Sequence, residues 1–316
     1  MIGYWFCKRL NMGKQIVLIM GILFSLVACR PAKDAYLFTS FHEPANEGLR
    51  LLYSYDGYAW NDLNKIFIAP QVGSKVMRDP SMIQSRDGNF HLVWTSGWKE
   101  DKGFGYATSK DLVHWSEQKF IPVRQHEDSV VNVWAPEIFN DMEKDQFIIV
   151  WASTIPYRFP KGEEDEHNNH RLYYTVTKDF KTFSPAKLFF DPGFSSIDAV
   201  LLQQDHEKYV QVLKDNTRPN RNLKVAFSND PLGPYANTSQ PFTENFIEGP
   251  TVVKVKDEWL IYFDSYRKKI YGAMKTKDFK SFTDITSRVS VPEGHKHGTI
   301  VTVKKKFIKE LKKNIE

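Results

Sequence analysis

The heptapeptide TKDFKTF at residues 177–183 returns as TKDFKSF at residues 276–282, and looser versions of it occur three more times. These are SYDGYAW at 54–60, SKDLVHW at 109–115 and SNDPLGPY at 228–235. Each copy begins with Ser or Thr, has Asp two residues later and ends near an aromatic residue. The five aspartates are 55, 68, 51 and 48 residues apart, a spacing typical of four-stranded propeller blades. The repeat therefore predicts an all-β fold, a single five-bladed β-propeller.

A second repeat marks the start of the first strand of each blade. Its copies, called strand-start motifs below, are Arg78-Asp79-Pro80, Trp134-Ala135-Pro136, Ile197-Asp198-Ala199, Glu248-Gly249-Pro250 and His297-Gly298-Thr299. Apolar strands and turns follow, such as the Asp87-Gly88 turn, which is a strong hairpin signal. The two repeats are out of phase by one, because the chain starts without a strand-start motif and ends with one. We therefore expect residues 299–303 to pair with the N-terminal strand and close the ring, which removes exposed sheet edges.

The first 28 residues have the pattern of a signal peptide, with basic residues before an apolar run at 15–28. This run of fourteen residues is shorter than the about 20 that a membrane-spanning helix needs. It ends in Ala28-Cys29, which resembles a bacterial lipobox, although an ordinary signal peptide or a signal anchor containing Cys fits the same pattern. We expect an exported protein that a lipid on Cys29 anchors to a bacterial membrane, the outer one. The protein would face the periplasm or the cell surface.

The remaining chain is expected to consist of a short tether at 29–34, the propeller at 35–303 and a basic helical tail at 304–316. The cysteines are Cys7 and Cys29, so processing leaves no thiol for catalysis, a disulfide or a metal site. The net charge is +5, of which the leader carries three positive charges. The lysines of the tail are typical of a solvated helix face, so nucleic-acid binding is not expected. We expect a monomer that contacts the membrane through its lipid alone.

Acidic residues stand in three of the strand-start motifs. In a propeller the first strands line the central channel, so Asp79, Asp198 and Glu248 should meet at one mouth. Mutual repulsion raises the pKa of at least one of several neighbouring carboxyl groups. One group can then donate a proton near neutral pH while another stays ionised.

The five strand-start motifs, with Ser81, Glu137 and Ile138 beside them, make nearly the whole mature chain similar to glycoside hydrolase family 43. The resemblance implies that Asp79 is the general base, Glu248 the general acid and Asp198 the residue that orients Glu248 and keeps it protonated. It implies inverting hydrolysis of a poly- or oligosaccharide, with α-L-arabinofuranosides or β-D-xylosides attacked from the chain end and galactofuranosides as a further option. Asp198 departs from the family pattern, because Ala199 follows it where Pro is commoner.

The supporting residues are less sharply defined. Trp98 and Trp134 are candidates for the walls that face the sugar, although either fits a core position equally well. Arg267 is a candidate partner of Asp198. His297 resembles the family's axial histidine, which lies near a water or a structural calcium ion in the channel; no metal or other cofactor is expected to be required. Glu137 is expected to point into its blade.

Other interpretations remain open at this stage. The invertase and fructanase propellers share Arg-Asp-Pro, but their Asn-Asp-Pro-Asn-Gly and Glu-Cys motifs are missing. A phosphorylase needs a basic phosphate pocket, which the sequence does not show. A non-catalytic glycan-binding lipoprotein is the main alternative from another class. The polar insertion at 161–170 contains acids and histidines without a metal-binding spacing, so we expect a solvated loop.

Overall fold

The computed structural model describes residues 34–99 and 101–316. Their fold is all-β apart from two helices near the C-terminus, η1 (Thr286–Arg288) and α1 (Lys305–Ile315). Neither helix, within this part of the chain, is long and apolar enough to cross a membrane. The expected signal peptide, the lipidated Cys29 and nearly all of the tether lie outside the described residues.

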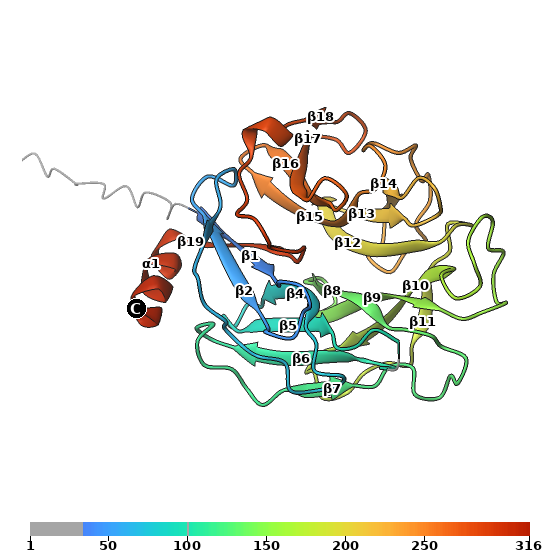
Figure 1. Cartoon of the computed structure of the whole chain (residues 1–316), viewed down its shortest axis with the longest axis horizontal. Coiled ribbons are helices and arrows are strands. Elements are labelled where there is room, and N and C mark those ends of the chain that lie inside the picture. Colours follow the sequence, from blue (N-terminus) through green and yellow to red (C-terminus); the bar gives the residue numbers. More distant parts are fainter. Residues whose placement is uncertain (1–33, 100) are drawn as a thin grey trace, which may run out of the picture. The chain divides into compact units, whose positions relative to one another are not determined.

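Five antiparallel sheets form the five blades of a propeller, as the repeat predicted (Figure 1). The first to third blades in chain order are β1 (Asp34–Ser40), β2 (Arg50–Ser54) and β3 (Asn61–Asp62); β4 (Arg78–Gln84), β5 (Phe90–Thr95), β6 (Phe104–Ser109) and β7 (Lys119–Ile121); and β8 (Trp134–Asp141), β9 (Gln146–Thr154), β10 (His170–Thr177) and β11 (Lys187–Phe190). The other two blades are β12 (Ser196–Asp205), β13 (Lys208–Asp215) and β14 (Asn222–Ser228); and β15 (Glu248–Val255), β16 (Glu258–Ser265), β17 (Ile270–Thr276) and β18 (Thr283–Asp284).

The C-terminal strand β19 (Ile300–Lys304) completes the first blade. It pairs antiparallel with β1, so that Ala35 lies opposite Val303 and Leu37 opposite Val301. The backbone N–H of Thr39 also donates to the carbonyl oxygen of Thr299 at 3.0 Å. The predicted closure of the ring by its two terminal strands is confirmed.

Four of the five repeats that predicted the blades fold into the same turn at the end of the third strand. In the copy after β10, the Thr177 hydroxyl accepts the N–H of Phe180 at 2.9 Å. The carboxylate of Asp179 accepts the N–H groups of Lys181 and Thr182, each at 2.9 Å. The copy after β17 repeats this geometry with Thr276 and Asp278. Ser, Thr and Asp are favoured in such turns because their oxygens replace backbone acceptors.

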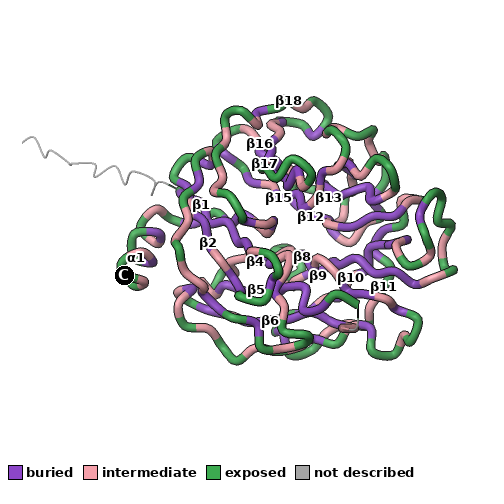
Figure 2. The backbone as a smooth tube through the Cα atoms, in the orientation of Figure 1, coloured by how far each residue is buried: buried purple, intermediate pink, exposed green. Residues whose placement is uncertain are grey.

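The core is divided into five apolar clusters, and each cluster lies between two neighbouring blades. Alternation along a strand sends successive side chains to opposite neighbours. On β9, for example, Ile149 and Trp151 join the cluster shared with the second blade, whereas Ile148 and Val150 join the cluster shared with the fourth. The buried residues therefore follow the inner strands around the ring (Figure 2).

Candidate active site

Four of the five strand-start motifs share an irregular backbone at the mouth of the channel. Asp79, Ala135, Asp198 and Gly249 have φ values of 48°, 48°, 52° and 56°. The strand register shifts at each of these four places, as in a β-bulge. A left-handed conformation is uncommon outside glycine, and such strain gathers at functional sites. Glu248 stands one residue before this left-handed position, so the acids come from two successive positions of the motif.

The motifs surround a pocket of about 210 Å³ that brings the three predicted carboxylates together. Trp98, Trp134 and His297 line it as well. The remaining lining residues are Arg78, Thr95, Asn168, Ile197, Lys214, Asn216 and Arg221. The residues that the resemblance singled out thus share one hollow, with the exception of Arg267.

Asp79 is held as a carboxylate by its neighbours. Its Oδ2 accepts a hydrogen bond from the Thr95 hydroxyl at 2.8 Å, and its Oδ1 lies 3.0 Å from Nε2 of His297. Burial alone raises the pKa of Asp79, but the bonds from His297 and Thr95 and the charge of Arg78 lower it to about 2. Asp79 is therefore ionised at any pH near neutrality, as a general base must be.

His297 lies between two carboxylates. Besides its contact with Asp79, its Nδ1 is 3.8 Å from Oδ2 of Asp264, an ion-pair distance. Burial lowers the pKa of His297, but Asp264 and Asp79 outweigh burial and raise it well above its ordinary value. The ring packs against Gly249, where a Cβ atom would lie 2.0 Å from Cγ of His297. Glycine at this position is what allows a charged imidazole to fill the space.

Glu248 forms an ion pair with Lys214, whose ammonium lies 3.0 Å from its Oε2. Lys214 is buried, at the end of β13. Burial raises the pKa of Glu248, but the charges of Lys214 and His297 exceed this and lower it. Without a bound sugar, Glu248 is therefore a carboxylate rather than the protonated acid that the resemblance implies.

The pKa of Asp198 is shifted in the opposite direction from that of Glu248. Burial raises its pKa, and the nearby charges of Lys214 and His297 only partly offset this. Its Oδ2 accepts the backbone N–H of Gly249 at 3.1 Å. Asp198 thereby holds the peptide that follows Glu248, a geometry suited to orienting that residue.

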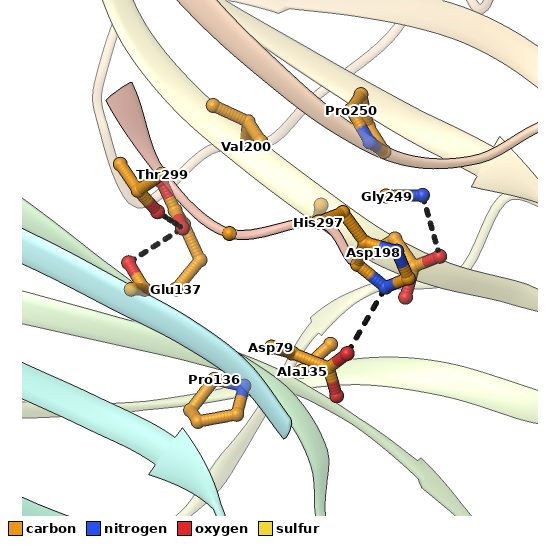
Figure 3. A pocket seen from close by; sticks show the side chains of 13 residues that line it. Asp79, Ala135, Pro136, Glu137, Asp198, Val200, Gly249, Pro250, His297 and Thr299 are labelled. Atoms are coloured by element: carbon orange, nitrogen blue, oxygen red, sulfur yellow. Dashed lines mark hydrogen bonds and ion pairs between the residues drawn. The ribbon is translucent and has the colours of Figure 1, made fainter. Parts of the chain in front are cut away.

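A narrower space of about 30 Å³ adjoins the pocket along the channel, where Asp79, Asp198 and His297 meet the residues of the other motifs (Figure 3). Glu137 lies in it and accepts hydrogen bonds from Ser81 at 2.7 Å and from Thr299 at 3.2 Å. Burial raises the pKa of Glu137 to about 7. The expectation that Glu137 points into its blade is wrong, because the bulge after Trp134 shifts the alternation of side chains.

Aromatic side chains form one wall of the pocket. The rings of Trp98 and Trp134 meet edge to face with centroids 6.1 Å apart, and the Trp134 indole N–H donates to the carbonyl oxygen of Trp98 at 2.7 Å. The guanidinium of Arg78 lies 4.0 Å from the Trp98 ring. Trp98 is 51% exposed, so it is not a core residue and about half of its surface is accessible to a ligand.

Arg267 does not contribute to this pocket. Its guanidinium lies 3.3 Å from the centroid of the Phe246 ring. It follows the end of β16 and stacks on this aromatic face instead of reaching Asp198. The positive charges near Asp198 are those of Lys214 and His297.

The polar insertion at 161–170 forms part of the pocket wall. The buried Glu164 accepts the backbone N–H of Arg218 at 2.6 Å and bonds the side chain of Asn168. This contact brings Asn168 to the pocket, beside Asn216. The buried Glu164 thus fixes the loop against the neighbouring blade, whereas Lys161, Gly162, Glu163, Asp165 and His167 are exposed, as in the solvated loop that was expected.

The calcium ion that the resemblance allows near His297 is poorly matched by the side chains at the channel. Glu248, Asp264 and His297 offer ligand atoms that lie within 4.8 Å of one another. Calcium takes six to eight oxygen ligands, whereas here Lys214 and Lys296 already pair with the two carboxylates. The third group is an imidazole with a raised pKa, which carries a positive charge of its own.

Residues 32–308 match the model of a family related to glycoside hydrolase family 43, described as "Probable glycosyl hydrolase domain". Among curated proteins, none matches the sequence. Solved structures with the same fold include the α-L-arabinanase of Cellvibrio cellulosa complexed with arabinohexaose, at 13% identity and a TM-score of 0.59, over 83% of this chain and 96% of that one.

Two other solved structures have the same fold, with comparable sequence identity and TM-score. A thermostable family 43 glycoside hydrolase shares 16% identity with a TM-score of 0.55, over 70% of this chain and 78% of its own. A family 117 glycoside hydrolase from the marine bacterium Zobellia galactanivorans shares 17% identity with a TM-score of 0.53, over 68% of this chain and 70% of its own. At such identities these likenesses establish the fold alone.

Proposed function

The chain belongs to the glycoside hydrolase 43-related family, and from this premise we propose that it hydrolyses glycosidic bonds with inversion, using Asp79 and Glu248. One observation carries the proposal: both carboxylates line the same pocket and both lie near the imidazole of His297. His297 contacts Asp79 at 3.0 Å, and its ring belongs with Glu248 to a group whose ligand atoms lie within 4.8 Å of one another.

In this mechanism Asp79 takes a proton from the attacking water. Its pKa of about 2 and its two hydrogen-bonded oxygens keep it ionised and oriented. Glu248 donates a proton to the leaving oxygen on the opposite side of the sugar. Inverting enzymes keep the two carboxyl groups roughly 6.5–9.5 Å apart to leave room for the water.

Glu248 must gain a proton before it can act. In the free protein the ammonium of Lys214 holds it ionised. A sugar hydroxyl that accepts a hydrogen bond from Lys214 would weaken this ion pair. Burial, the largest influence on Glu248, would then raise its pKa. Asp198, through its bond to the N–H of Gly249, keeps Glu248 turned toward the substrate.

The pocket suits one terminal sugar. Its volume of about 210 Å³ is below the 300–1,000 Å³ typical of sites for drug-sized ligands. We propose an exo-acting enzyme that removes terminal α-L-arabinofuranosyl or β-D-xylosyl residues. The similar solved structures support this range, since they include an α-L-arabinanase and an α-L-arabinofuranosidase from Lactobacillus brevis.

Release of 4-nitrophenol from aryl pentosides tests the proposal. We expect Asp79→Asn and Glu248→Gln each to reduce kcat/KM by about 10²–10⁴-fold, the range for loss of a general acid or base. Glu310→Gln on α1, which pairs with Lys306 away from the pocket, should keep wild-type activity. Near-normal activity in either pocket variant would remove the assignment. Glycan binding without release by the wild type would favour a non-catalytic binding protein.

We further propose that the protein is exported and anchored by a lipid on Cys29. The pattern of the first 29 residues supports this, and metabolic labelling with tritiated palmitate checks it. The wild type should incorporate label and sediment with membranes, whereas Cys29→Ser should do neither. Label in the Cys29→Ser variant would contradict the proposal.

A further inference from the structure

Arg221 lines the pocket and has no carboxylate partner among residues 34–99 and 101–316. The other basic side chains there are paired, Arg78 with Glu43 at 2.5 Å and Lys214 with Glu248 at 3.0 Å. The side chain of Arg221 makes no ion pair or hydrogen bond within the described residues, and its Nε is shielded from solvent. A buried donor left without an acceptor is costly, more so when it is charged. A ligand acceptor at this place would remove that cost.

The backbone of Arg221 is bonded to the strand start that carries the proposed acid. Its carbonyl oxygen accepts the N–H of Ile247, the residue before Glu248, at 2.9 Å. The acid of an inverting enzyme faces the leaving oxygen. Arg221 therefore lies on the side of the pocket from which the leaving group departs.

The acidic side chains near Arg221 are paired with other basic residues of the described chain. Asp215, the strand partner of Asn222, pairs with Lys224 at 2.7 Å. The acids of the insertion at 161–170 are engaged by Arg218, whose side chain lies 2.9 Å from Asp165 and 3.5 Å from Glu164. The insertion presents the amide of Asn168 to the pocket instead, next to that of Asn216. The local wall thus offers one unpaired guanidinium and two neutral amides.

We propose that the leaving-group side of the pocket binds an acidic sugar, whose carboxylate or sulfate ester is held by Arg221. This inference rests on the proposed function, because that function defines the leaving-group side. A guanidinium binds a planar carboxylate or a sulfate through two parallel N–H donors. The substrate class is then a neutral terminal sugar attached to a uronate-bearing or sulfated glycan.

Isothermal titration of the wild type with glucuronic acid, galacturonic acid and galactose 6-sulfate, each against neutral glucose or galactose, tests the proposal. We expect at least one acidic sugar to bind at least ten-fold more tightly than its neutral counterpart, with an affinity that falls as salt is added. The carboxylate and sulfate arms show which anion is recognised. Arg221→Gln should abolish the preference, and Arg221→Lys should keep only part of it.

Arg288 provides the matched control, because this arginine likewise makes no ion pair within the described residues and lies outside the pocket, with its guanidinium 5.4 Å from the centroid of the Tyr58 ring. Arg288→Gln should retain the full preference. Equal binding of acidic and neutral sugars by the wild type would overturn the proposal without using any variant. Hydrolysis of aryl pentosides together with equal binding would refute only the acidic sugar. An Arg221-dependent preference without hydrolysis of any glycoside would instead refute the proposed function.

Discussion

At the scale of single residues, the sequence predicted those site residues that stand in a repeated motif. Asp79, Asp198, Glu248 and His297 were found because their motifs recur at blade starts, and all four line the pocket. Lys214 and Asn216 were not found, since a polar residue near the end of a second strand carries no motif of its own. Lys214 comes to lie beside the acids only because β12 pairs with β13, which sets Ile197 opposite Lys214.

Lys214 gives the sharpest prediction at this scale. In Lys214→Met the positive charge that lowers the pKa of Glu248 is lost, while burial still raises it. The alkaline limb of the kcat/KM profile reports deprotonation of the acid, so it should move to higher pH. A profile measured with an aryl pentoside over the full pH range of stable protein checks this.

A variant that breaks another partly buried Lys–Glu pair controls for effects of losing any such ion pair. Lys275→Met breaks the pair with Glu258 at 2.9 Å, away from the pocket, and should leave the profile unchanged. An alkaline limb that stays in place or moves down in Lys214→Met would show that Glu248 is not the acid.

At the scale of elements, local chemistry accounts for what could be predicted. The turns after the third strands form from their own Ser, Thr and Asp oxygens, so their sequence was sufficient. The loosest copy, at 228–235, belongs to the blade with three strands among the described residues. Pro231 and Pro234 lack the N–H that a further strand needs there. The bulges at the strand starts were not predicted, because their left-handed residues include Asp and Ala as well as Gly.

Gly249 tests whether the bulge positions the site. In Gly249→Ala the new Cβ would lie 2.0 Å from Cγ of His297, so the ring must move away from Asp79. We expect kcat/KM to fall by about 10²-fold or more, because the general base loses its partner. The free energy of unfolding should fall by about 1–3 kcal/mol from overpacking and by a further about 1–2 kcal/mol from alanine in a left-handed conformation.

Gly88 in the hairpin between β4 and β5 is a matched control. It is also left-handed, with φ 85°, but a Cβ there meets nothing within 4 Å. Gly88→Ala should lose about 1–2 kcal/mol of stability from the backbone conformation alone and keep its activity. Equal activity of the two variants would show that crowding at His297 does not matter.

At the scale of the whole molecule, the out-of-phase repeats were enough to predict a closed ring. The sequence did not reveal the side chains that fasten it, since they come from both ends of the chain. His295 lies shortly before β19. Its Nδ1 atom shares a hydrogen bond of 2.6 Å with the Ser40 hydroxyl, and its Nε2 atom lies 3.2 Å from Oδ2 of Asp62. This buried network joins β1 and β3 to the segment leading into β19.

The network makes ring closure sensitive to acid. Burial lowers the pKa of His295 from 6.5 to about 4. Between these values the unfolded chain binds a proton that the folded chain does not, so the free energy of unfolding falls as the pH falls through this window. The contribution of one such histidine is up to about 3 kcal/mol. Glu137 acts in the opposite sense, because its pKa of about 7 makes the fold lose stability as the pH rises from 4.5 to 7.

Urea unfolding of the wild type and His295→Gln at several pH values between 4 and 7 measures this contribution. Near pH 7 the variant should have a lower free energy of unfolding than the wild type, because it lacks the hydrogen bonds of the neutral His295. This difference in free energy should shrink by up to about 3 kcal/mol toward pH 4. His206→Gln, whose side chain is 82% exposed, should follow the wild type throughout. Parallel stability curves for His295→Gln and the wild type would mean that closure of the ring does not depend on a neutral His295.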